Sequence, residues 1–171
     1  IDPLERHYVE EVMTRAVETI DASTTLADVL RHHFGPAQKY RAYPVVSAGA
    51  LVGMVDRVLL DRIAPGQSDS PIGAFFAHER PEIALPGETC RNVAARLAIT
   101  GLTRVPVVED ERTLRLVGIV SRHDLVKPSS SVFSEEREVE QFRRVWIPRS
   151  ALFAPTNKRQ EAPREHADTS R

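Results

Sequence analysis

The sequence predicts an α/β protein built from two copies of one β-α-β-β-α unit, and three internal repeats support that prediction. Tyr-Pro-Val-Val at 43–46 recurs as Val-Pro-Val-Val at 105–108, with Pro44 and Pro106 62 positions apart. Leu-Val-Gly-Met-Val-Asp-Arg at 51–57 recurs as Leu-Val-Gly-Ile-Val-Ser-Arg at 116–122, 65 positions on. Residues 25–29 match residues 89–93 at an offset of 64. Segments that recur at nearly constant spacing indicate one supersecondary unit used twice.

Each copy predicts the same elements in the same order. An extended segment comes first, at 17–20 and at 82–85. An amphipathic helix follows at 26–34 and 90–100, because its apolar residues keep to one helical face. Two β-rich runs then form a hairpin, 44–46 with 51–55 and 105–108 with 116–120, around the turn residues Ala48-Gly49 and Asp110-Glu111. A last helix begins at Asp56 or at Ser121.

The repeats also set the expected domain boundaries. We expect a first repeat at 9–64, a linker at 65–71, a second repeat at 72–127 and a C-terminal tail at 128–171. The tail is expected to include a charged helix at 135–146 and to be disordered near its end. The two repeats are expected to pack as a pair with an approximate two-fold axis. Gly53 and Gly118, inside strands, indicate a bulge or a close backbone approach.

Composition excludes several classes of protein. The 171 residues carry a net charge of −1, so no global field attracts nucleic acid or an anionic membrane. Cys90 is the single cysteine, which excludes an internal disulfide and suits a reducing compartment. The histidines show no metal-site spacing, and no nucleophile or phosphate-loop motif is present. Because the chain begins at Ile1 without methionine, we expect it to be part of a longer protein.

The repeated motifs resemble a tandem pair of CBS domains, named after cystathionine β-synthase. The resemblance spans about residues 9 to 126, and it is carried by the two Pro-Val-Val runs and by Leu-Val-Gly-Ile-Val-Ser-Arg-His-Asp-Leu at 116–125. It implies two repeats packed through their sheets, with clefts that hold adenosine-containing ligands. It also implies that ligand occupancy regulates an attached enzyme, channel or transporter.

Ser121 and Asp124 are the sharpest candidates for ligand contact. The resemblance places the serine near a phosphate or ribose and the aspartate on ribose hydroxyls, with Arg122 between them. The same Ser-x-x-Asp spacing also predicts a capping pair for the helix that begins there, and spacing alone does not choose between the two. In the first copy Asp56 and Leu59 stand at these positions, so we expect one functional nucleotide cleft.

Aromatic and basic residues before the first hairpin give further candidates. Tyr40 is a candidate to stack on adenine and Arg41 to approach phosphate, whereas core packing is favoured for Tyr43. Tyr40 and Asp124 together resemble the ATP-binding domains of CLC chloride channels and transporters. Some members of that family contact the nucleotide from the first strand, which points here to Val17 or Thr19.

We therefore expect a non-enzymatic regulatory module of a chloride channel or chloride/proton transporter, with ATP, ADP or AMP as its ligand. It would lie on the cytoplasmic side of the inner membrane, joined to a transmembrane domain of the same chain and without nucleic acid as a partner. The alternatives are a sensor of a soluble metabolic enzyme or kinase, and a ligand-free dimerisation module. A homodimer is expected, with contacts at Val58, Leu59, Leu60, Leu125 and Val126.

Overall fold

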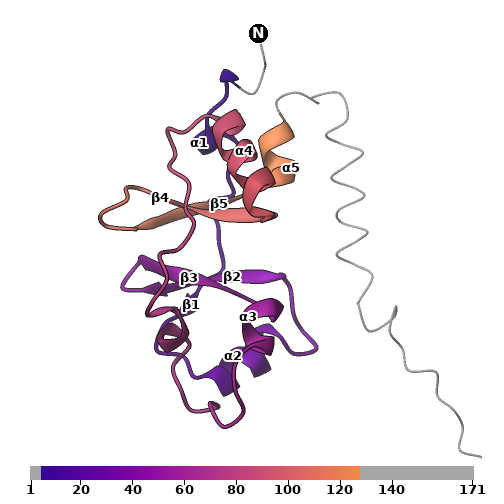
Figure 1. Cartoon of the computed structure of the whole chain (residues 1–171), viewed down its shortest axis with the longest axis vertical. Coiled ribbons are helices and arrows are strands. Elements are labelled where there is room, and N and C mark those ends of the chain that lie inside the picture. The colour runs from indigo at the N-terminus through magenta and orange to yellow at the C-terminus, as the bar shows by residue number, and fades with distance from the viewer. Residues whose placement is uncertain (1–4, 128–171) are drawn as a thin grey trace, which may run out of the picture. The chain divides into compact units, whose positions relative to one another are not determined.

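The computed structural model describes residues 5–127. Its elements, in chain order, are α1 (Val9–Val12), β1 (Ile20–Asp21), α2 (Leu26–His33), β2 (Ala42–Ser47), β3 (Ala50–Asp56), α3 (Arg57–Asp61), η2 (Ile72–Phe76), α4 (Cys90–Thr100), β4 (Arg104–Val108), β5 (Leu116–Ser121) and α5 (Arg122–Val126) (Figure 1). Two copies of a helix, a hairpin and a short helix are present. The tail at 128–171, with the predicted helix at 135–146, lies outside the described residues.

The first repeat forms a three-stranded sheet in the order β1-β2-β3. β1 runs parallel to β2, with Ile20 opposite Val45, and β2 runs antiparallel to β3. Ala48 and Gly49 both have positive φ, 48° and 82°. A two-residue turn with two positive φ angles matches the twist of antiparallel strands, which is why this hairpin closes so tightly.

The second repeat has the two-stranded sheet β4-β5. The predicted extended segment at 82–85 makes one parallel bridge, between Ala84 and Val107, and is too short to count as a strand. Pro81 and Pro86 bracket this segment. Proline has no N–H to donate to a ladder, so each of the two residues removes one possible hydrogen bond at an end of this segment.

Both hairpins contain a bulge next to the repeated glycine. The register shifts between Val45 and Val46 opposite Gly53, and between Val107 and Val108 opposite Gly118. A Cβ atom on Gly53 would lie 2.3 Å from Cδ1 of Phe76. The predicted close approach at the two glycines is therefore confirmed.

The segment before each repeat packs against the other repeat. Ahead of the first repeat, Val9 of α1 is buried in the second core, and Thr14 exchanges two backbone hydrogen bonds with Ile119 of β5 at 2.8 and 2.9 Å. After the linker, Ile72 of η2 is buried in the first core, and the Gly73 N–H donates to the Ala22 carbonyl at 2.9 Å. The first core is thus completed by η2, which follows the linker, and the second core is completed by α1, which precedes the first sheet.

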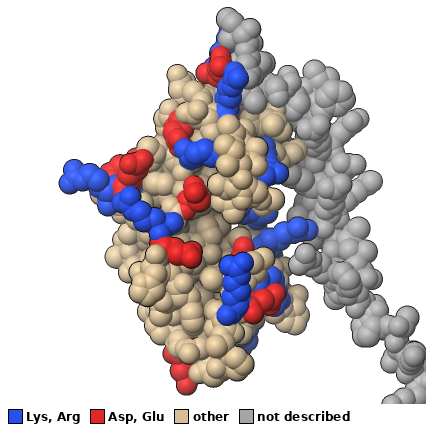
Figure 2. All heavy atoms as spheres, in the orientation of Figure 1, with Lys and Arg blue, Asp and Glu red and all other residues tan. Residues whose placement is uncertain are grey.

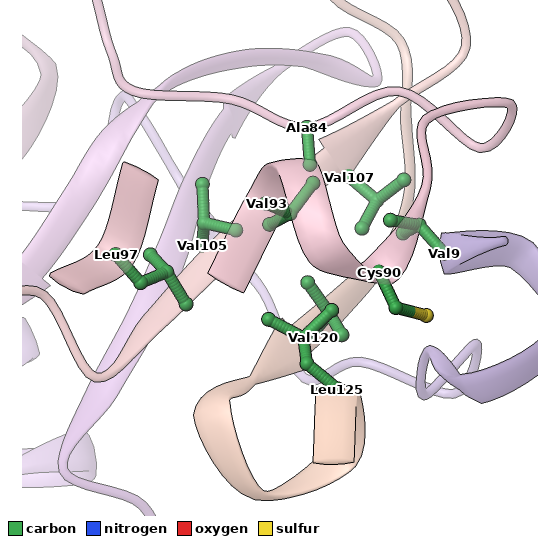
Figure 3. Close-up of a cluster of buried hydrophobic side chains, with 9 residues drawn as sticks. All are labelled: Val9, Ala84, Cys90, Val93, Leu97, Val105, Val107, Val120 and Leu125. Atoms are coloured by element: carbon green, nitrogen blue, oxygen red, sulfur yellow. The ribbon is translucent and has the colours of Figure 1, made fainter. Parts of the chain in front are cut away.

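Two hydrophobic cores result. The first contains Ile20, Leu26, Val29, Phe34, Tyr43, Val45, Val55 and Ile72. The second contains Val9, Ala84, Cys90, Val93, Leu97, Val105, Val107, Val120 and Leu125, which converge between α4 and the β4-β5 sheet (Figure 3). Leu125 has no exposed surface. Its expected role as a dimer contact is wrong, because the amphipathic turn of α5 directs this side chain inwards.

The two hairpins meet near their turns. The Leu51 N–H donates to the Leu114 carbonyl at 2.8 Å, and the Leu116 N–H donates to the Gly49 carbonyl at 3.1 Å. These residues occupy equivalent places in the two copies, so the bonds are reciprocal. Together with the exchanged segments, they give the pair the expected approximate two-fold relation.

Candidate functional site

Ser121 and Asp124 form a reciprocal cap at the start of α5. The Asp124 N–H donates to Ser121 Oγ at 3.1 Å, and the Ser121 N–H donates to Asp124 Oδ2 at 3.0 Å. The helix-cap interpretation therefore describes the ligand-free geometry. It leaves groups for a ligand, because the Ser121 hydroxyl can still donate its proton. Asp124 Oδ1 lies 3.7 Å from Lys127 Nζ, a distance too long for a hydrogen bond.

Arg122 is bound to the protein itself. Its Nη2 donates to the Leu97 carbonyl in the last turn of α4, at 2.8 Å. Arg57 does the same in the first repeat, where its Nη2 donates to the Phe34 carbonyl at 2.6 Å. A guanidinium is favourable at a helix C-terminus, where it lies at the negative end of the helix dipole. Both arginines thus tie the helix after a hairpin to the helix before it.

The first repeat differs at the equivalent cap. The Leu59 N–H donates to Asp56 Oδ1 at 2.8 Å, so a carboxylate caps α3 where a serine caps α5. The Leu59 side chain packs against the first core. An apolar group there has no means to bind ribose hydroxyls, whereas Asp124 in the second repeat has.

Tyr40 and Tyr43 differ in how deeply they are buried. Tyr43 is 2% exposed, and its hydroxyl accepts from the N–H groups of Lys39 and Tyr40 at 3.3 and 3.2 Å. Tyr40 is 51% exposed and its ring meets that of Tyr43 edge to face, with centroids 5.7 Å apart. Core packing of Tyr43 is therefore observed. Tyr40 is held in place with its ring accessible.

The first-strand candidates lie just before β1. Val17 is half-buried and Thr19 is exposed. Between them, Glu18 Oε1 lies 3.8 Å from Nδ1 of His33, a nitrogen that is buried without a hydrogen bond. His33 in turn packs edge to face on Tyr43, with ring centroids 4.9 Å apart. Glu18, the residue between the two candidates, is thus the one that lies near the aromatic group supporting Tyr40.

Charged residues of both repeats act on Arg104. Arg104 begins β4 opposite Ser121, and Asp56 ends β3 opposite Ala42, the neighbour of Arg41. Burial and the positive charge of Arg41 lower the pKa of the Arg104 guanidinium, while Asp124 and Asp56 oppose that shift. We call Arg41, Arg104, Asp56 and Asp124 the arginine–aspartate cluster.

Arg104 was missed by the sequence analysis. It directly precedes the Val-Pro-Val-Val motif, and the equivalent residue of the first repeat is Ala42. A half-buried arginine beside a second arginine is a favourable place for phosphate. The face in Figure 2 shows basic and acidic side chains next to one another, with no broad region of one sign. Binding of phosphate here therefore depends more on the local placement of charged side chains than on the net charge of the chain.

Residues 5–127 offer little support for a metal site or a reactive thiol. No group of three or more histidine, cysteine or acidic residues there is placed to hold a metal ion. Cys90 is fully buried, and burial is the main cause that raises the pKa of its thiol. Such a thiol is a poor nucleophile. No helix in the described part of the chain is both long and apolar enough to cross a membrane.

Comparison with known families identifies the repeats. Residues 9–58 and 76–130 match the CBS domain. This match covers more than half of the chain, so the chain belongs to the CBS domain family and carries two of these domains in tandem. No match was found among curated proteins.

Solved structures show the same fold. CBSX2 in complex with AMP is 22% identical, with a TM-score of 0.60 over 74% of this chain and 98% of that one. The CBS domain of a bacterial CNNM/CorC family Mg²⁺ transporter in complex with ATP is 22% identical, with a TM-score of 0.56 over 73% and 88%. An uncharacterized conserved protein from Pyrococcus horikoshii is 26% identical, with a TM-score of 0.60 over 74% and 55%.

Proposed function

We propose that this CBS pair is a regulatory module that binds an adenine nucleotide in one cleft. The arginine–aspartate cluster is the observation that carries this proposal, because Arg104 pairs in register with Ser121 and the charge of Arg41 acts on Arg104. Similar CBS structures hold AMP and ATP, which supports the same ligand class here. The first repeat has Asp56 and Leu59 at the equivalent cap, so the proposal is limited to one site.

The proposed contacts follow from the groups left accessible. Tyr40 presents an exposed ring on which a base can stack. Asp124 keeps one carboxylate oxygen for ribose hydroxyls, because the other is used in the cap. The Ser121 hydroxyl, Arg41 and Arg104 then meet the phosphate, and these groups are typical partners of phosphate oxygens.

The module would act by linkage and not by catalysis. A nucleotide that binds one arrangement of the two repeats better than another shifts their equilibrium by that difference in binding free energy. The proposed cleft takes residues from both repeats, so a bound nucleotide would affect the arrangement of the two repeats. This is the proposed role in place of an enzymatic one.

The proposed host is a membrane transporter. One similar CBS domain belongs to a Mg²⁺ transporter, which supports a membrane-attached host. The pairing of Tyr40 with Asp124 favours a CLC-type chloride channel or transporter, with the module on the cytoplasmic side of the inner membrane. The gene upstream of Ile1 tests this: apolar spans of about 20 residues are expected, and a soluble enzyme or kinase domain there would contradict it.

Calorimetry on the chain with ATP, ADP, AMP and adenosine tests the nucleotide proposal. Tyr40→Ala removes the stacking surface and Asp124→Asn weakens the hydrogen bonds to ribose. Each is expected to reduce affinity about tenfold or more, since a stacked base or a charged hydrogen bond contributes about 1–3 kcal/mol. Tyr8→Ala is the matched control, because Tyr8 is also exposed, at 45%, and caps the start of α1 outside the site. Absence of binding at millimolar nucleotide would refute the proposal.

Self-association is a second proposed property. Val58 on α3 is 60% exposed and Leu30 on α2 is 40% exposed, although both are apolar. A two-fold partner would cover such residues. Light scattering of the chain should then show a dimer that Val58→Asp weakens. A dimer without nucleotide binding would favour the alternative of a ligand-free dimerisation module.

A further inference from the structure

Tyr40 stands in a segment without regular structure, between α2 and β2. Residues 38–40 belong to neither a helix nor a strand, and the Tyr40 side chain is half exposed. The backbone of Tyr40 is nevertheless bonded on both sides. Its N–H donates to the Tyr43 hydroxyl at 3.2 Å, and its carbonyl accepts from Gln38 Nε2 at 2.9 Å. The place of the Tyr40 ring therefore depends on the groups that hold this segment.

Tyr43 is the anchor to which the segment is bonded. It lies in β2 with 2% of its surface exposed, and its ring meets the rings of His33 and Phe34 edge to face, with centroids 4.9 and 5.6 Å away. Its hydroxyl also accepts from the Lys39 N–H, at 3.3 Å. A hydroxyl oxygen has lone pairs for two such donors. One oxygen on a buried ring thus ties two successive residues, Lys39 and Tyr40, to the sheet.

The second repeat has no such anchor. At the offset of 62 that relates the two Pro-Val-Val runs, Val105 stands in the place of Tyr43 and Leu102 in the place of Tyr40. Val105 is buried in the second core, as Tyr43 is in the first. An apolar side chain is therefore enough for core packing at this position. The hydroxyl of Tyr43 needs a different explanation, which its two bonds to the segment supply.

Building on the proposed nucleotide site, we infer that the Tyr43 hydroxyl is a positioning group that holds Tyr40 where the base of the nucleotide stacks. Tyr43 acts through Tyr40 and does not itself contact the ligand. A ring that is held in place before binding loses less conformational freedom when the base stacks on it, so the affinity is higher. The hydroxyl thus contributes to binding only while the Tyr40 ring is present.

Tyr43→Phe tests the inference, because it removes the hydroxyl and keeps the buried ring. Calorimetry with ATP should show an affinity about fivefold lower than in wild type, since binding then has to order the segment around Tyr40. In a Tyr40→Ala background the same substitution should lower the affinity no further, because the ring on which the hydroxyl acts is absent. The four chains form a double-mutant cycle that measures this dependence.

Tyr8→Phe is the matched control. It removes a tyrosine hydroxyl from a side chain that is 45% exposed and lies outside the site, and it should leave ATP affinity unchanged. An equal loss of affinity on Tyr43→Phe with and without the Tyr40 ring would overturn the inference, because the hydroxyl would then support the cleft independently of Tyr40. Unchanged ATP affinity in the Tyr43→Phe chain would overturn it as well.

Hydrogen exchange on the chain without ligand separates this inference from the proposed function. If ATP fails to bind the wild-type chain, the proposed function fails, and the amides of Lys39 and Tyr40 alone decide whether the hydroxyl holds the segment. Both should exchange faster in Tyr43→Phe, whereas the Val29 amide, which donates to the Thr25 carbonyl at 3.0 Å, should keep its wild-type rate. Unchanged rates at Lys39 and Tyr40, or equal acceleration at all three amides, would overturn the holding role.

Discussion

At the scale of single residues, the guanidinium groups of Arg57 and Arg122 have the same structural role in the two repeats. Both follow a capping residue directly and both donate to a carbonyl at the end of the preceding helix. The sequence analysis assigned Arg122 to the ligand because it stands inside the Ser-x-x-Asp motif. A sequence fixes the position of an arginine, whereas the direction of its long side chain depends on which carbonyl the fold brings near.

Removal of either guanidinium should destabilise the fold. Arg122→Ala is expected to lower the free energy of unfolding by about 1 kcal/mol, because it breaks a charged hydrogen bond in a partly exposed place. Arg57→Ala should cost more, since the Arg57 guanidinium also lies 5.5 Å from the centre of the Phe34 ring. Urea unfolding of the two variants measures both values. Lysine at either position should restore only part of the loss, and an Arg57→Ala chain as stable as wild type would contradict the account.

At the scale of elements, the hairpins were predictable and their surroundings only in part. Local signals were sufficient for the hairpin strands, the Ala48-Gly49 turn and the caps at Asp56 and Ser121. The extended segments predicted at 17–20 and 82–85 form only the two-residue strand β1 and one bridge at Ala84. The exchanged segments were not predicted, because a repeat in sequence assigns α1 and η2 to the repeat that follows them. Their packing depends on apolar residues, Val9 and Ile72, whose partners lie far along the chain.

The two strand glycines allow these exchanged segments to approach, but against different obstacles. A Cβ atom on Gly53 would meet the Phe76 ring at 2.3 Å. A Cβ atom on Gly118 would meet the Thr14 backbone carbonyl oxygen at 2.8 Å, as well as the Met13 sulfur at 2.9 Å. A side chain can rotate or be shortened, whereas a backbone held by two hydrogen bonds to Ile119 cannot easily move.

Alanine at either glycine should therefore destabilise the protein by about 1–3 kcal/mol, the usual cost of overpacking. Gly53→Ala should cost clearly less in a Phe76→Ala background, because the obstacle has been removed. Gly118→Ala should cost nearly the same in a Met13→Ala background, because the Thr14 carbonyl remains. Two double-mutant cycles, measured by denaturant unfolding, compare these values. Full additivity at Gly53 and Phe76 would contradict the proposed contact.

At the scale of the whole molecule, the pair is held by reciprocal exchange. Each core contains a residue supplied from outside its own repeat, Val9 in one case and Ile72 in the other. The hairpins are also joined by the two bonds between 49–51 and 114–116. The arginine–aspartate cluster lies across the same boundary, which is why no single repeat motif revealed it. Arg104 stands out only when the charges of Arg41 and Asp56 in the other repeat are considered with it.

This exchange predicts that the two repeats unfold together. Val9→Ala removes buried methyl groups from the second core, and Ile72→Ala does the same in the first; each should cost about 2–4 kcal/mol. Because each core depends on a segment joined to the other, either variant should lower amide protection in both repeats by the same free energy. Hydrogen exchange at Val29 in α2 and at Val93 in α4 measures this. If Val9→Ala loosened Val93 alone and left Val29 as protected as in wild type, the repeats would be independent, and a nucleotide in the proposed cleft would have no cooperative unit to act on.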